Sequence, residues 1–131
     1  MKTGDTFLLL DRHTGVRHLY VVLSDPMQSS DQIFIVMVST RGDGKEECCV
    51  LRTGDHPFIQ HDSVTVYRIP PAELVSLSQL DQWKGDGRLT QSKNHIPVTE
   101  TVLERMRQGY SRSRYRTDRV YQLLFRQGLV D

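Results

Sequence analysis

The 131-residue sequence predicts a mainly β fold with C-terminal helices, built as a single domain. Short apolar, β-branched runs fill the first half, turn-forming residues separate them, and clear amphipathic helical patterns begin only after Pro97. Because no helix-length pattern separates the early runs, neighbouring strands are expected to pair antiparallel, as a small curled sheet or barrel. We therefore expect a β core over residues 1–90 and a basic helical extension over residues 91–131.

Five apolar runs are each short enough for a strand and too short for an independent helix. The segments between them carry the Gly, Pro, Asp and Ser that turns require. The run around Phe34 is apolar on both faces, which predicts a strand in the middle of the sheet. The five expected strands are Thr6–Leu10, His18–Leu23, Gln32–Ser39, Cys48–Leu51 and Val64–Ile69.

Helical signals follow the Pro70-Pro71 break. A short helical turn is expected within Pro70–Leu80. Thr99 is the expected cap of a first C-terminal helix that ends at Gly109. Thr117 is the expected cap of a second helix, which has Gly128 as its stop.

Composition bounds the class of protein. A chain of this length with 37% hydrophobic residues can bury a core without disulfides or metal. No apolar run approaches the roughly 18 residues of a membrane span, and the N-terminus has no apolar signal core, so a cytoplasmic location is expected. Cys48 and Cys49 are adjacent, and a disulfide between them would be strained, so both are expected as reduced thiols.

The net charge of +1 hides an asymmetry along the chain. Residues 1–90 hold 9 Lys/Arg against 12 Asp/Glu, whereas residues 91–131 hold 8 against 4. Arginines interleaved with tyrosines are typical of segments that contact phosphates and stack on bases. An alternative is a solvated helix face with its connecting loop. The candidate nucleic-acid-binding residues are Arg112, Arg114, Tyr115 and Arg116.

A pattern over roughly residues 4–75 resembles the PemK/MazF-like toxin family. A Gly-Asp pair opens the first strand, an arginine precedes a strand that ends in Val-Val-Leu-Ser, a hydroxyl pair ends the apolar strand, and Asp-Ser-Val opens a later strand. These features are Gly4-Asp5, Arg17 with Val21–Ser24, Ser39-Thr40 and Asp62–Val64. The chain departs from the family at His18, where a proline is usual, and at Ser39, which matches the family's threonine.

The resemblance implies an SH3-like β-barrel and a cytosolic endoribonuclease that cleaves single-stranded RNA without a metal cofactor. It also implies an antitoxin protein as partner, and a homodimer. The arginine and the hydroxyl at the end of the apolar strand would form the catalytic site, so the resemblance places Arg17 and Ser39, with the neighbouring Thr40, in that role.

Metal-free RNA cleavage needs a base for the 2′-hydroxyl, a cation for the charged phosphorane and a donor to the leaving oxygen. The planar fork of Arg17 suits the cation, and Ser39 or Thr40 can hydrogen-bond the scissile phosphate. His18, next to Arg17, is the candidate base. Strand alternation opposes a joint role, because adjacent residues point to opposite faces.

The segment Asp55–Asp62 holds His56 and His61, which raises the alternative of a metal site. Their separation of five positions suits neither one helix face nor one strand face, and no third histidine lies near in sequence. We expect a loop there and no metal or cofactor. Two further classes stay open: a non-catalytic nucleic-acid-binding module on the same fold, and a small structural or antitoxin-like partner protein.

Overall fold

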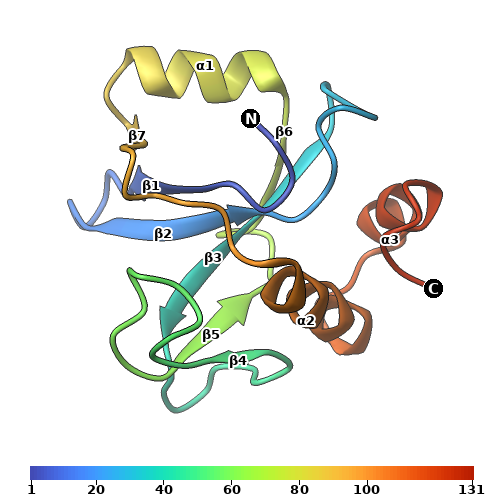
Figure 1. Ribbon diagram of the computed structural model, residues 1–131. Helices are drawn as coiled ribbons and strands as arrows, with labels where there is room; N and C mark the ends of the chain where they lie inside the picture. The colour runs from blue at the N-terminus through green and yellow to red at the C-terminus, as the bar shows by residue number, and fades with distance from the viewer.

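The computed structural model describes residues 1–131 as a seven-stranded antiparallel sheet with three helices (Figure 1). All five expected strands are present, with ends that shift by a few residues, and the mainly β prediction is confirmed. The strands are β1 Thr6–Leu10, β2 Arg17–Val22, β3 Ile33–Thr40, β4 Val50–Leu51, β5 Ser63–Val66, β6 Glu73–Val75 and β7 Leu89–Thr90.

The sheet is open. Its strands follow the order β4-β5-β3-β2-β1-β7, and β6 also pairs with β3. The eight-residue β3 pairs with β6 through its first half and with β5 through its second half. At the two ends, β4 and β7 are two residues each and pair only with β5 and β1. No pairing joins these ends, so the expected closure into an SH3-like barrel is not observed.

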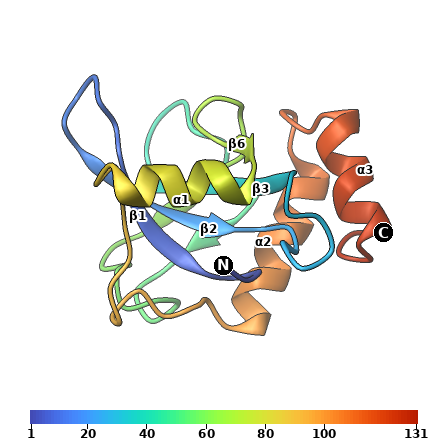
Figure 2. The same cartoon turned by 90° about the horizontal axis from the view of Figure 1, so that it is seen from above.

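Each face of the sheet carries its own core. Helix α1, Leu77–Gly85, covers one face, and helices α2, Glu100–Arg112, and α3, Asp118–Arg126, lie on the other side (Figures 1 and 2). Alternation along β3 sends Ile33 and Ile35 into the α1-side core, and Phe34 and Val36 into the α2-side core. A central strand that is apolar on both faces was therefore predicted correctly.

The two C-terminal helices begin as expected. The hydroxyls of Thr99 and Thr117 accept hydrogen bonds from the backbone three residues later, which caps α2 and α3. The predicted stop at Gly109 was wrong, because α2 continues to Arg112. Gly109 instead lies where the helix touches the sheet: a Cβ built there would be 2.5 Å from the hydroxyl of Tyr67.

The basic extension is also part of the core. Val102, Met106 and Leu124 pack in the same cluster as the sheet residues, so residues 91–131 complete the domain. Arg107 is only 5% exposed and donates to the Leu23 carbonyl and the Thr3 hydroxyl. A separate basic tail is therefore not observed.

Within Pro70–Leu80, the expected helical turn is present as the first turn of α1, and the unexpected strand β6 precedes it. Residues 73–75 pair as a strand with the first half of β3, which β5 leaves unpaired. Ser76 then caps α1, because its hydroxyl accepts a hydrogen bond from the Gln79 backbone N–H. None of the three helices has the length and apolar character needed to cross a membrane.

Candidate functional site: a basic cleft beside the β1–β2 hairpin

A cleft of about 580 Å³ lies on the α1 side of the sheet, between the β1–β2 hairpin and the segment that joins β5 to β6. Its lining combines groups that bind anions with groups that transfer protons. These residues are Arg12, His13, His18, Arg68 and Arg88. The other hollow of about 580 Å³ contains no histidine.

Packing fixes two walls of the cleft. The Tyr20 hydroxyl donates to the Pro71 carbonyl at 3.1 Å and so holds the segment between β5 and β6 over β2. Burial raises the pKa of Tyr20 to about 12, so this phenol stays a neutral donor. The Arg88 guanidinium lies 4.5 Å from the Trp83 ring centre and donates to the Leu10 carbonyl, which fixes it between α1 and β1.

The cleft carries an excess of positive charge, with three arginines against the two carboxylates of Asp11 and Glu73. The side chains of Arg12 and Arg68 take part in none of the structure's hydrogen bonds or salt bridges, and both are exposed. Burial raises the pKa of Glu73, and the charge of Arg88 opposes that effect. The guanidinium groups of Arg12 and Arg68 are therefore free to bind an anion such as a phosphate.

Alternation divides the four catalytic candidates between the two faces of the sheet. His18 has the parity of Tyr20 and Val22, which belong to the α1-side core. Ser39 has the parity of Ile35 on β3 and lies on the same face as His18. Arg17 and Thr40 have the opposite parity and fall on the α2 side.

On the α2 side, Arg17 donates to the carbonyls of Gly87 and Arg88, both at 3.0 Å. The Thr40 hydroxyl lies 3.0 Å from Nε2 of His61. Arg17 and Thr40 thus already have protein partners, and neither lines the cleft.

Ser39 is linked to the tail through Lys45. The Lys45 ammonium donates to the Ser39 hydroxyl at 3.0 Å and to the Thr40 carbonyl at 2.7 Å. Lys45 also lines a small pocket with Tyr115, and Arg68 lines both this pocket and the cleft. The cleft that contains His18 and the small pocket that contains Tyr115 therefore meet at Arg68. Lys45 joins Ser39 to the small pocket.

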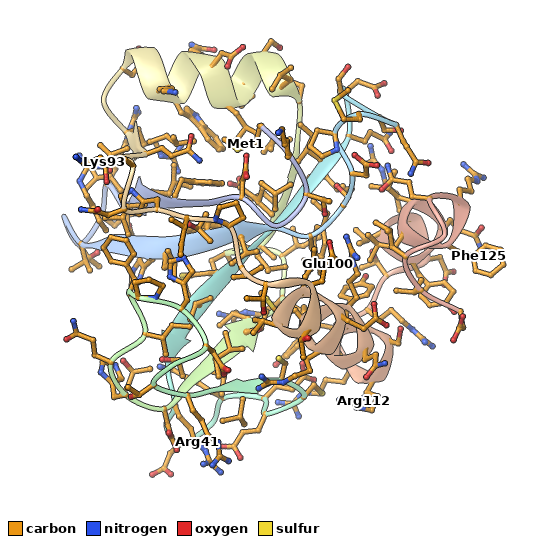
Figure 3. The ribbon with its side chains drawn as sticks, in the orientation of Figure 1. Met1, Arg41, Lys93, Glu100, Arg112 and Phe125 are labelled. Carbon is orange, nitrogen blue, oxygen red and sulfur yellow. The ribbon has the colours of Figure 1, made fainter.

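The other tail candidates are exposed, and two of them have backbone partners. Arg112, at the C-terminal end of α2, donates to the Cys48 carbonyl, and Arg116 donates to the Ser111 carbonyl (Figure 3). The guanidinium of Arg114 lies 5.1 Å from the ring centre of Tyr115, so these two side chains form one cation–π unit.

The Asp55–Asp62 loop is a packed structural element. Nε2 of His56 lies 2.6 Å from the Ile96 carbonyl, and the Phe58 ring stacks between His56 and His95. His61 instead contacts Thr40. The structure contains no group of three His, Cys, Asp or Glu side chains arranged to hold a metal ion. Both cysteines are free thiols, and burial raises their pKa.

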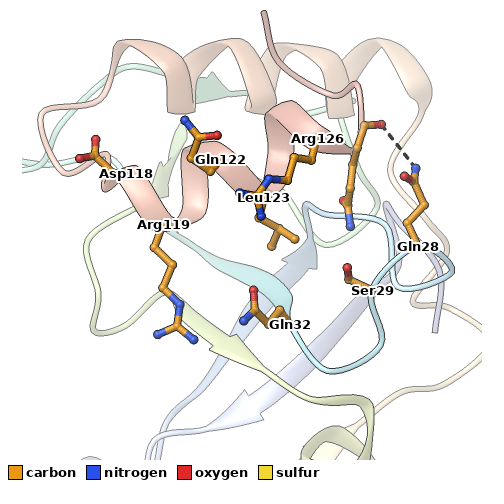
Figure 4. A pocket seen from close by; sticks show the side chains of 9 residues that line it. Gln28, Ser29, Gln32, Asp118, Arg119, Gln122, Leu123 and Arg126 are labelled. Carbon is orange, nitrogen blue, oxygen red and sulfur yellow. Dashed lines mark hydrogen bonds between the residues drawn. The ribbon is translucent and has the colours of Figure 1, made fainter.

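A second hollow of about 580 Å³ lies between α3 and the loop that joins β2 to β3 (Figure 4). Glutamine amides and the exposed Arg119 and Arg126 dominate its lining. The Gln28 amide donates to the Gln127 carbonyl and links the loop to the end of α3. This hollow contains no histidine or cysteine, so the basic cleft is the better candidate for chemistry.

Four of these cleft residues were not among the sequence candidates: Arg12, His13, Arg68 and Arg88. Arg68 had a usable signal, because it continues the alternation of Val64 and Val66 at the end of an expected strand. Arg88 had none, since it reaches the cleft through the pairing of β7 with β1. No protein-family model, curated protein or solved structure matches this chain.

Proposed function

We propose that this protein is an endoribonuclease that cleaves single-stranded RNA without a metal ion, and that the basic cleft is its active site. The observation that carries the proposal is the placement of two histidines and three arginines in one cleft. Histidines suit proton transfer near neutral pH, and guanidinium groups suit phosphate. The arginines of the cleft would bind the phosphate and stabilise the negative charge of the transition state, and the histidines would transfer the protons.

The reaction needs only the RNA and these side chains. His18 removes the proton from a 2′-hydroxyl, O2′ bonds to the adjacent phosphorus, and the P–O5′ bond breaks. His13, in its protonated form, gives its proton to the leaving 5′ oxygen, while Arg68 and Arg88 stabilise the additional negative charge on the phosphorane. The products are a 2′,3′-cyclic phosphate and a 5′-hydroxyl.

We extend the proposal to the biological role of a toxin in a toxin–antitoxin pair. The PemK/MazF-like pattern over residues 4–75 supports it, together with a single long strand, β3, whose one edge is shared by β5 and β6 as in a strongly curled sheet. The role includes an antitoxin protein as partner and a homodimeric toxin. Expression without the partner is expected to arrest growth.

A non-catalytic RNA-binding module is the second candidate, and one observation favours it. The imidazoles of His13 and His18 make no hydrogen bond to any protein group that would orient them; the bond between His13 and Asp11 is donated by the His13 backbone N–H. Catalytic bases are usually oriented by a third group. In that case the cleft binds phosphates and releases the RNA intact.

Incubation of a long single-stranded RNA with the purified protein in EDTA distinguishes these functions. We expect cleavage by the wild type, a loss of about 100-fold or more in His18→Asn, and unchanged cleavage in the matched control His61→Asn. Intact RNA that is nevertheless bound would support the module. Cleavage only after addition of a divalent ion would contradict the metal-free reaction.

A further inference from the structure

A second, smaller pocket of about 110 Å³ lies along the outer edge of β5, next to the basic cleft. Its walls are the loop at residues 44–46, residues 65–68 at the end of β5 and just beyond it, and Tyr115. Arg68 belongs to both hollows, so a ligand that extends out of the cleft past Arg68 enters this pocket.

Hydrogen bonds to one carboxylate hold the two sides of the pocket together. Glu46 accepts from the Ser113 hydroxyl at 2.6 Å and from the Arg114 backbone at 2.9 Å. The Ser113 hydroxyl in turn accepts from the backbone of Tyr115 at 3.0 Å. Ser113 is buried and Glu46 is half-buried, and their hydrogen bonds fix the backbone that carries Tyr115.

The strand wall of the pocket offers polar groups without partners. The last hydrogen bond between β5 and the segment that precedes β4 is donated by the Thr65 backbone N–H to the Cys49 carbonyl. Beyond that point the Tyr67 backbone N–H makes no backbone hydrogen bond, and the buried Thr65 hydroxyl has no hydrogen-bond partner. Native proteins satisfy nearly all such buried groups, so these two are available to a ligand that enters the pocket.

The size of the pocket limits its occupant. An engineered cavity of about 150 Å³ holds one benzene ring, so a pocket of about 110 Å³ that is open on one side matches one six-membered ring more closely than a fused two-ring base. The combination of an aromatic wall, edge-on donors and a neighbouring guanidinium matches a nucleotide.

We propose that this pocket binds the base of one pyrimidine nucleotide of a single-stranded RNA. The base stacks on Tyr115 and hydrogen-bonds the β5 edge, and its phosphate contacts Arg68 on the way to the cleft. The inference rests on the proposed function for RNA as the nucleic acid, and it adds base selection. Thr65 and Tyr115 are then specificity-determining residues.

Fluorescence anisotropy with 2′-O-methyl pentanucleotides of uridine and of adenosine tests the proposal, because these probes bind but lack the attacking hydroxyl. We expect the wild type to bind the uridine probe about 10-fold or more tightly than the adenosine probe. Tyr115→Ala should weaken uridine binding about 5- to 100-fold, whereas Tyr115→Phe should restore it. The matched control Tyr121→Ala removes another tyrosine that lies under an arginine, and binding should not change.

Equal affinity for the two probes, unchanged binding by folded Tyr115→Ala, or no binding at all would overturn the pocket. Should Tyr115→Ala fail to fold, Thr65→Val provides the test and should reduce the preference for uridine by about 3-fold or more, whereas an unchanged preference would overturn the pocket. RNA cleavage without base preference would refute the pocket and leave the nuclease intact. Uridine-selective binding without cleavage would support the pocket and refute the nuclease.

Discussion

Replacement of Gly109 by alanine tests the packing of α2 on the sheet, which positions Tyr67 beneath the small pocket. An added Cβ would lie 2.5 Å from the Tyr67 hydroxyl, 2.9 Å from the Cys48 carbonyl oxygen and 2.9 Å from the Cys49 Cβ. Two of these three atoms belong to the backbone or are attached directly to it. They cannot move without displacing the chain that leads into β4.

Two opposing effects determine how Gly109→Ala changes the free energy of unfolding. Alanine is favoured over glycine inside a helix by about 1 kcal/mol. Overpacking costs about 1–3 kcal/mol, and the displaced Tyr67 hydroxyl loses its 2.6 Å hydrogen bond to the Met106 carbonyl, which adds about 1–3 kcal/mol in a buried site. The steric cost exceeds the gain in helix propensity, so we expect Gly109→Ala to lower the free energy of unfolding by about 2 kcal/mol or more.

Urea denaturation followed by circular dichroism measures this change. Gly85→Ala is the matched control, because Gly85 is also a helical residue, the last of α1, and a Cβ there meets nothing within 4 Å. We expect the control to leave stability unchanged or to raise it by up to about 1 kcal/mol. Equal or higher stability of Gly109→Ala would refute the close packing of α2 against Tyr67 and the Cys48-Cys49 segment.

The remaining predictions concern charge. Arg107→Ala should lower the free energy of unfolding by about 2–4 kcal/mol, whereas Arg107→Met, which keeps the buried stem, should change it by less than about 1 kcal/mol in urea titrations. Because the folded-state pKa of Glu73 is raised, its destabilising effect appears as pH rises past its ordinary value, so Glu73→Gln should raise Tm at pH 7 and not at pH 4. Arg68→Gln should reduce the slope of log Kd against log salt concentration for RNA binding by about 0.7, as measured by filter binding. An unchanged slope would show that Arg68 does not contact a phosphate.

The sequence predicted most elements whose pattern is local. Five strands follow from apolar runs between turn residues, and the caps Thr99 and Thr117 follow from hydroxyls placed before amphipathic stripes. Strands β6 and β7 were missed because two or three residues carry no period of their own, and tertiary pairing alone makes them strands.

The site was predictable only in part. His18 was named as a candidate because it adjoins Arg17, and strand alternation predicted that the two point to opposite faces, as they do in β2. Gly109 was read as a helix stop because the same residue type serves termination and close packing, and only the position of Tyr67 distinguishes these roles. Arg88 enters the cleft from a distant part of the chain, which no local pattern encodes.

Backbone ¹H–¹⁵N correlation spectra, recorded during titration with the 2′-O-methyl uridine pentanucleotide, test the central claim most directly. The account predicts the largest shift changes at His18, Arg68 and Tyr115, along the path from the cleft to the small pocket. Changes confined to the α2-side residues Arg17 and Thr40, with the cleft unaffected, would contradict it.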